Sequence, residues 1–484
     1  MELPHALSAD FRVLSKLRSD RFSLYEVVAS VRSSHQADTT PGRLRRQQLM
    51  RIRRGRTDRH TEAFLDRQPA EATSPLFVPL LSKRQQLYAI TDIELAKAVL
   101  MDPETFNRAR TLESFADAFR LTSVFTTKDA GLHKELKAFF KAQTNRLSDD
   151  VIEANKVIFE RHVDEMLRTF EPGTSVRFVP RVEGMVLAAY GEAFFGMKSF
   201  PSAEECAVLI KEIWQIKSLR NNAPGCRYNP RLLAQLRWKQ RRLFGIIEHA
   251  QSLVDRNGSE AARSMAEVYG AHGYAPGNLL NAFIPLYEAV ARGLVFAMME
   301  FADAPDVRDQ LREEILSNSN DDSAYCAATD TLLERTWRET LRLRPPTPNQ
   351  TRRVTIADHP LFAEDSKVVI VWGVFHRDRD VWGADADLFR PDRWLETTSA
   401  QLRNYNPFGS GAQACVAKHY ASHGGRVMIK RILDRSEFGF VKPAATTDDV
   451  GTDRKYSRGP DPDTALLRFT PRRAREGVSV PVGT

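Results

Sequence analysis

The chain has 484 residues, of which 42% are hydrophobic and 27% charged, with a formal net charge of +8. These values are ordinary for a soluble globular protein, and the length allows a core that encloses a sizeable cofactor. The four cysteines (Cys206, Cys226, Cys326 and Cys415) are widely spaced, which argues against a disulfide framework or a zinc site. Free thiols indicate a reducing compartment.

The N-terminal residues 1–75 are predicted to be a basic extension of a single domain over 76–484. Eight arginines lie between Arg43 and Arg59. A solvated surface explains most such runs, and a docking face for an acidic electron donor or membrane headgroups is the alternative. Nucleic-acid binding is not expected, because no reader motif accompanies the run. Acidic residues within 1–35 argue against a targeting presequence, and no apolar run there approaches the ~20 residues that span a bilayer. The sequence therefore predicts a soluble, cytoplasmic protein without a transmembrane anchor, with peripheral membrane association as an option.

Hydrophobic periodicity predicts many helices and few strands. The elements expected in chain order are a short strand pair and a helix within 76–100, helical segments over 132–253 broken near Pro172, Pro201 and 221–230, a long helix at about 276–301, helices at 305–316 and 332–343, strands at 353–356 and 368–371, and a last helix at about 416–433. The long helix is apolar nearly all round, which predicts that it is buried. The helix at 332–343 should end before Pro345, since proline cannot continue it.

Three motifs follow one another in the last third of the chain. Glu339 and Arg342, at i and i+3, lie on one helical face and can pair. The loop Phe389–Trp394 offers Arg393 as a further partner, which would complete a Glu–Arg–Arg network. The segment Pro407–Cys415 carries glycines that let the backbone approach a flat ligand, and its cysteine enters a helix N-terminus, which favours a thiolate. Each motif alone is unspecific: a surface pair, a loop and an inert buried thiol are the common explanations.

Together the motifs resemble the C-terminal signature of the cytochromes P450, with Glu339 and Arg342, then Pro391–Trp394, then Phe408, Gly411 and Cys415 in matching order and spacing. The resemblance implies a mainly α fold with small peripheral β-sheets (α+β). It also implies a buried haem b between the long distal helix and the proximal loop and helix that follow Cys415, the axial ligand.

The resemblance further assigns residues around the haem. Gln413 stands where arginine usually meets a propionate, Lys137 keeps the charge of a family arginine without its planar fork, and Arg353 is expected at a propionate with Arg352 as the less favoured alternative. The cofactor-binding residues expected are Cys415, Phe408, Gly409, Gly411, Gln413, His133, Lys137 and Arg353.

The distal helix departs from the family pattern. Glu288 supplies the acid of the usual acid–alcohol pair, but Ala289 stands where the alcohol is expected. Tyr287 or a substrate hydroxyl is the candidate substitute, and Pro285 can kink the helix and free a carbonyl to hold water.

Several functions remain open at this point. The first is a monooxygenase that uses O2 and electrons from NAD(P)H through a separate reductase, a flavoprotein or ferredoxin-type donor bound to a basic proximal face. The alternatives are an isomerase, dehydratase or peroxygenase acting on a peroxide, a haem-binding protein without turnover, and an unrelated helical binding protein. The expected substrate is an apolar small molecule of secondary metabolism, contacted by Phe115, Phe119, Phe283 and Asn349.

Overall fold

The computed structural model describes residues 77–80, 87–144, 149–200, 202–222, 226, 228–274, 279–318, 322–359, 361–411, 414–440 and 466–471. The basic run 43–59 and the rest of the predicted extension lie outside the described residues. Within them, no helix is both long enough and apolar enough to span a bilayer.

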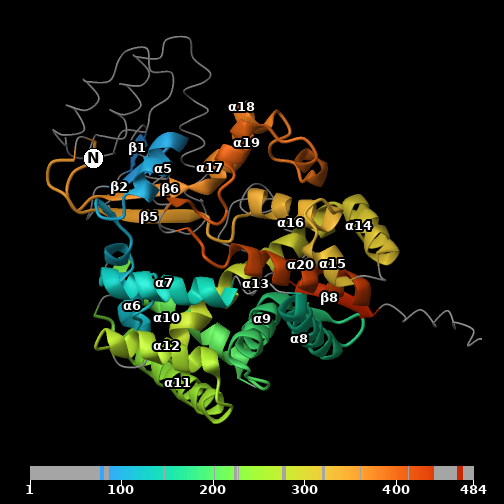
Figure 1. Ribbon diagram of the computed structural model, residues 1–484, viewed down its shortest axis with the longest axis horizontal. Coiled ribbons are helices and arrows are strands. Elements are labelled where there is room, and N and C mark those ends of the chain that lie inside the picture. The colour runs from blue at the N-terminus through green and yellow to red at the C-terminus, as the bar shows by residue number, and fades with distance from the viewer. Residues whose placement is uncertain are drawn as a thin grey trace, which may run out of the picture.

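Helices make up most of the described chain (Figure 1). The helices are α5 (Ile93–Met101), α6 (Glu113–Phe119), α7 (Ala130–Thr144), α8 (Asp149–Arg168), α9 (Phe178–Phe195), α10 (Ala203–Asn222), α11 (Pro230–Arg256), α12 (Glu260–Ala271), α13 (Leu280–Asp303), α14 (Pro305–Ser317), α15 (Asp322–Ala327), α16 (Leu332–Leu343), α17 (Trp372–His376), α18 (Arg379–Trp382), α19 (Ser399–Asn404) and α20 (Lys418–Arg435), with short 3-10 turns at Ala109–Thr111 and Pro391–Trp394. The strands are β1 (Phe77–Leu80), β2 (Leu87–Ile90), β3 (Phe106–Asn107), β4 (Ser175–Arg177), β5 (Asn349–Val354), β6 (Lys367–Val371), β7 (Ser436–Phe440) and β8 (Leu466–Pro471).

Two small sheets flank the helices. The larger has the order β1-β2-β6-β5-β3, with β2 parallel to β6 and the other neighbours antiparallel; the smaller has the order β4-β8-β7. In Figure 1 the larger sheet lies at one side, and α13, α16 and α20 form the centre. The prediction of a mainly helical fold with small sheets is therefore confirmed.

Helix α13 is the long central helix that the apolar pattern predicts, and it packs against α9, α16 and α20. Its contact with α16 depends on a glycine, because a Cβ on Gly293 would lie 2.6 Å from the Trp337 ring. Gly425 of α20 approaches the same ring equally closely. The indole of Trp337 thus fills the space beside these two glycines, and this packing holds α16 between α13 and α20.

Candidate haem-thiolate site

The loop before α20 brings Cys415 to an accessible position. The Cys415 N–H donates to the Phe408 carbonyl at 3.0 Å, which closes the loop. Gly409 and Gly411 have φ values of +69° and +72°, a region that favours glycine. A Cβ on Gly411 would also lie 2.6 Å from the Leu100 carbonyl oxygen. The sequence therefore needs glycine here both for the turn and for close approach.

The Cys415 thiol feels two opposing effects. Burial among the surrounding protein atoms raises its pKa, and a hydrogen bond from the backbone of Ala417 lowers it. That bond, at the entrance to α20, stabilises the thiolate rather than the thiol. A metal ion bound to the sulfur would overcome the raised pKa, since a coordinating thiol is deprotonated.

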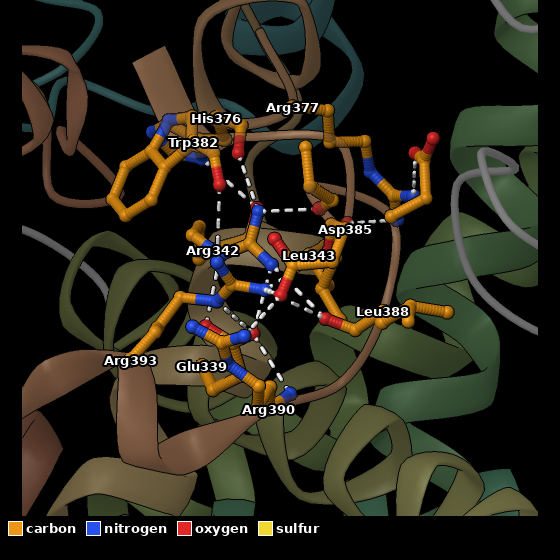
Figure 2. Close-up of polar contacts among 12 residues, drawn as sticks. Glu339, Arg342, Leu343, His376, Arg377, Trp382, Asp385, Leu388, Arg390 and Arg393 are labelled. Carbon is orange, nitrogen blue, oxygen red and sulfur yellow. Dashed lines mark hydrogen bonds and ion pairs between the residues drawn. The ribbon is translucent and has the colours of Figure 1, made fainter. Parts of the chain in front are cut away.

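Glu339 of α16 is the centre of the predicted Glu–Arg–Arg network (Figure 2). Arg342 pairs with it in a bidentate manner, with both N–O distances at 2.8 Å, and Arg393 Nε donates to it at 2.9 Å. The Glu339 carboxylate also accepts hydrogen bonds from Trp394 Nε1 at 3.1 Å and from the Arg390 backbone N–H at 3.0 Å. Because Glu339 and Arg342 are fully buried, this network is a structural centre rather than a surface ion pair.

Arg342 extends the network into the segment that precedes the cysteine loop. Its Nη1 donates to the carbonyls of His376 and Ala386, both at 2.7 Å. Burial, and next the charge of Arg342, lowers the pKa of His376 to about 3, so its imidazole stays neutral. The spatial convergence of Glu339, Arg342 and Arg393 agrees with the geometry expected from their spacing.

Buried and half-buried cations gather near α7, and one of them was not predicted. Arg108 follows β3, donates to the Val124 carbonyl at 2.8 Å and lies over the Phe125 ring. Burial, and next the charge of Arg352, lowers its pKa to about 9, and burial lowers the pKa of Arg352 to about 10. Among the described residues, neither guanidinium forms an ion pair with a carboxylate.

The predicted residues His133 and Lys137 of α7 belong to the same group of cations. Burial lowers the pKa of each, and the charge of Arg108 lowers both further. Four positive or potentially positive groups thus lie close enough to disfavour one another's charge. A ligand with carboxylates would relieve this repulsion. No local motif singles out Arg108, because it lies in a loop whose position only the tertiary fold sets.

Arg353 and Arg352 are adjacent on β5, so their side chains point to opposite faces of the sheet. Arg353 pairs with Asp365 at 2.8 Å, whereas Arg352 is 3% exposed and close to Arg108. The structure therefore places Arg352, and not the expected Arg353, beside the other cations.

The distal residues of α13 do not act as a single group. Ala289 is exposed, and Glu288 forms an ion pair with Arg292 one turn further along the helix. Tyr287 is 2% exposed, and burial raises the pKa of its phenol, with Glu288, Glu183 and Cys206 adding to the effect. The Tyr287 side chain therefore points toward α9 and α10, whereas Ala289 lies on an exposed side of α13.

The residues predicted to contact the substrate lie in different parts of the structure. Phe115 packs on Phe119 and on Trp214 of α10, with ring centroids 4.9 Å and 5.0 Å apart, so this pair belongs mainly to the α6–α10 packing. Asn349 begins β5 and is half-buried. The side chain of Phe283 and the whole of Gln413 lie outside the described residues.

These residues fit a haem with a thiolate ligand. An accessible thiol that accepts a backbone N–H can supply the axial ligand, and the buried guanidinium groups of Arg108 and Arg352 can pair with its two propionates. The class of protein that the helical fold and this loop define is a haem-thiolate protein.

Comparison with known proteins agrees with this class. The sequence profile described as Cytochrome P450 matches residues 278–454. The chain is 35% identical over 173 residues to "Bifunctional cytochrome P450/NADPH--P450 reductase ALT2" of Alternaria alternata, a match that covers 34% of this chain and 16% of that protein. It is 31% identical over 158 residues to "Cytochrome P450 monooxygenase aclC" of Aspergillus oryzae, covering 31% of this chain and 32% of that protein.

A plant protein, "Cytochrome P450 714C3" of Oryza sativa, is 28% identical over 199 residues, covering 38% of this chain and 37% of that protein. Residues 278–454 of the chain thus match the cytochrome P450 family. Its matches span well under half the length of each of these three relatives.

Proposed function

We propose that the chain is a haem-thiolate monooxygenase that oxidises an apolar small molecule of secondary metabolism by hydroxylation, coupling or desaturation. The observation that carries the proposal is the accessible Cys415 thiol, which accepts a hydrogen bond from the backbone of Ala417 at the entrance to α20. When bound, thiolate-ligated haem supplies the chemistry that activates dioxygen with two electrons. Cys206 and Cys326 are buried and form no disulfide among the described residues, which supports a reducing, cytoplasmic compartment.

Arg108, Arg352, His133 and Lys137 are the residues that would orient the cofactor. Their charges disfavour one another in the protein alone, which supports a role in binding propionates. Arg108 would compensate for the charge that Gln413 does not provide. Arg352 takes the role first expected of Arg353, whose guanidinium is already paired with Asp365.

A basic surface near the cysteine loop supports a separate electron donor. The Thr144 hydroxyl, at the end of α7, donates to the Val416 carbonyl at 3.3 Å, so α7 ends beside the loop. Exposed Lys141 of α7 and Lys418 of α20 flank this contact. An acidic flavoprotein or ferredoxin-type donor, itself supplied with electrons by NAD(P)H, would be attracted to these charges.

One observation favours a second candidate, the rearrangement or dehydration of a peroxide substrate without external electrons. Ala289 offers no hydroxyl, and Tyr287 is directed into the α9–α10 core and cannot replace it. Glu288 forms an ion pair with Arg292, so its carboxylate already has a partner on the same helix. In the monooxygenase, protons would reach the distal side from Glu288 or through water; in the peroxide reaction no such delivery of protons is required.

Spectroscopy followed by two activity assays tests the proposal. The reduced protein with carbon monoxide should show the red-shifted Soret band of thiolate ligation, and Cys415→Ala should lose it. NADPH with a reductase should then drive oxidation of a substrate found by its effect on the iron spin state. Turnover with a lipid hydroperoxide alone would instead select the second candidate. A colourless protein, or iron held by a nitrogen ligand in place of Cys415, would reject both.

A further inference from the structure

The imidazole of His272, the residue directly after α12, lies against the start of α7. Its Nε2 is 3.2 Å from Oε1 of Glu135, and its Nδ1 is 3.7 Å from Oδ2 of Asp129. Gly131 makes room for the ring, because a Cβ at that position would lie 2.8 Å from Cε1 of His272. Helices α7 and α12 pack against each other. The ring thus lies between two carboxylates, in a space that a side chain at residue 131 would fill.

Asp129 connects the ring to the first turn of α7. Its Oδ1 accepts the backbone N–H of Leu132 at 3.0 Å, which satisfies one of the free amides at the start of the helix. Its other oxygen faces His272. Nearby on α12, Tyr269 donates its hydroxyl to the Thr122 carbonyl at 2.6 Å. The end of α12 therefore contacts both α7 and the segment that leads into it.

The two sides of α7 carry different groups. Gly131 and Glu135, which contact His272, are about one helical turn apart. His133 and Lys137 each follow one of them by two positions, about 200° around the helix, so they lie on the other side. These two are the α7 residues of the proposed haem site. A contact at His272 therefore supports the helix from the side away from the cofactor.

The charge of His272 decides whether this contact attracts. Both contacts are ion pairs only while the ring carries a proton, and histidine changes its charge within about pH 5–8. Of the lysines next to the two acids in the chain, Lys128 pairs with Glu113 at 2.6 Å and Lys134 is exposed. From α9, which also packs against α12, no ion pair reaches His272 among the described residues. The attraction is thus present at low pH and lost as the pH rises.

We propose that protonated His272 is a positioning residue that holds the first turns of α7 against α12 and so keeps His133 and Lys137 directed toward the cofactor. The consequence for the cofactor rests on the proposed haem site. The contact itself does not, because it joins only side chains of this chain. Haem should be retained more firmly at slightly acidic pH than at slightly alkaline pH, as far as His272 contributes.

Amide hydrogen exchange of the full chain, read by mass spectrometry over residues 133–137, tests the contact. At about pH 6 the parent should exchange there about two- to fivefold more slowly than His272→Gln, the range expected of a partly exposed ion pair. At about pH 8 the two proteins should exchange equally, because the neutral ring has no charge to lose. Release of haem to an acceptor protein should follow the same pattern.

Two further variants separate this contact from a general loss of stability. His249→Gln removes an exposed histidine of α11 and should exchange like the parent at both pH values. Glu135→Gln should lose part of the protection at low pH, and adding it to His272→Gln should change nothing further, since the two side chains act as a pair.

Two results would overturn the proposal: equal exchange of the parent and His272→Gln at the lower pH, or a difference that persists at the higher pH. The second would mean that the ring acts by its shape. If exchange follows the expected pattern but the reduced protein with carbon monoxide lacks the Soret band of thiolate ligation, the contact is supported and the haem site is rejected.

Discussion

Asn406 donates its backbone N–H to Nε2 of His376 at 3.0 Å, while Nδ1 of the same ring lies 3.1 Å from the carbonyl oxygen of Arg342. One nitrogen therefore accepts and the other donates, which requires the neutral tautomer. Asn406 in turn accepts the N–H of Gly409 through its carbonyl. A single neutral histidine thus connects the buried Glu–Arg–Arg network to the loop that presents Cys415.

This arrangement predicts a dependence of stability on pH. The pKa of His376 is about 3 in the folded protein, against about 6.5 for an unperturbed histidine. Below about pH 6.5 the unfolded chain binds a proton that the folded chain does not, so the free energy of unfolding falls by at most about 1.4 kcal/mol per pH unit until the folded pKa is reached. Above pH 6.5 the contribution is fully present.

Urea unfolding between about pH 7.5 and about pH 5 measures this slope. In His376→Leu the slope should be shallower, and the protein should also be less stable because the Asn406 N–H loses its acceptor. The control His249→Leu removes an exposed histidine of α11 and should keep the parent slope. Identical slopes in the parent and His376→Leu would mean that the ring is protonated in the folded state, contrary to the geometry.

Replacement of Glu339 by glutamine should be among the most destabilising conservative changes. It leaves the buried guanidinium groups of Arg342 and Arg393 without their shared carboxylate, and breaking such a pair costs about 3–5 kcal/mol. The control Glu153→Gln removes one side of a surface pair with Lys156, which is worth less than about 1 kcal/mol. Denaturant titration of the two variants compares these costs. A difference near zero would show that the network is dispensable for folding.

Much of the fold could be predicted from sequence because it depends on local signals. The helix over Leu332–Leu343 was predicted with its observed bounds, since Thr331 caps its start and Pro345 prevents its continuation. The expected strand at 353–356 is instead Asn349–Val354, because pairing with β6 sets its register. The strands β4, β7 and β8 were not predicted; they pair residues far apart in the sequence, and their composition gives little local signal.

The site was predictable where a motif is continuous and less so where tertiary contacts decide. Cys415, Glu339, Arg342 and Arg393 follow from spacing. The choice between Arg352 and Arg353 depends on which face of β5 turns toward Arg108, and the sequence alternation there does not reveal it. The direction of Tyr287 likewise depends on the packing of α13 against α9 and α10.

Haem retention should separate the two adjacent arginines. Arg352→Gln should release haem to an acceptor protein about tenfold faster or more, since a hydrogen bond to a charged group contributes about 1.5–3 kcal/mol. Arg353→Gln should release it at nearly the parent rate, because Arg353 pairs with Asp365. In the haem-free chain, Arg352→Gln removes the repulsion between Arg352 and Arg108. This variant should therefore unfold at a higher urea concentration than the parent. Faster release from Arg353→Gln alone would restore the original assignment.

The missing alcohol at Ala289 predicts poor use of electrons in the monooxygenase reaction. With reductase and NADPH, the parent should release a substantial part of the consumed electrons as hydrogen peroxide, because no hydroxyl beside Glu288 organises water for proton delivery. Ala289 is exposed, so a slightly larger side chain can be accommodated. Ala289→Thr should therefore lower the ratio of peroxide released to NADPH consumed, whereas Ala289→Val, which has nearly the same shape without the hydroxyl, should not. Equal ratios in the two variants would mean that bulk and not the hydroxyl matters. A parent that releases almost no peroxide while forming product would show that Glu288, ordered water or the substrate itself already supplies the proton.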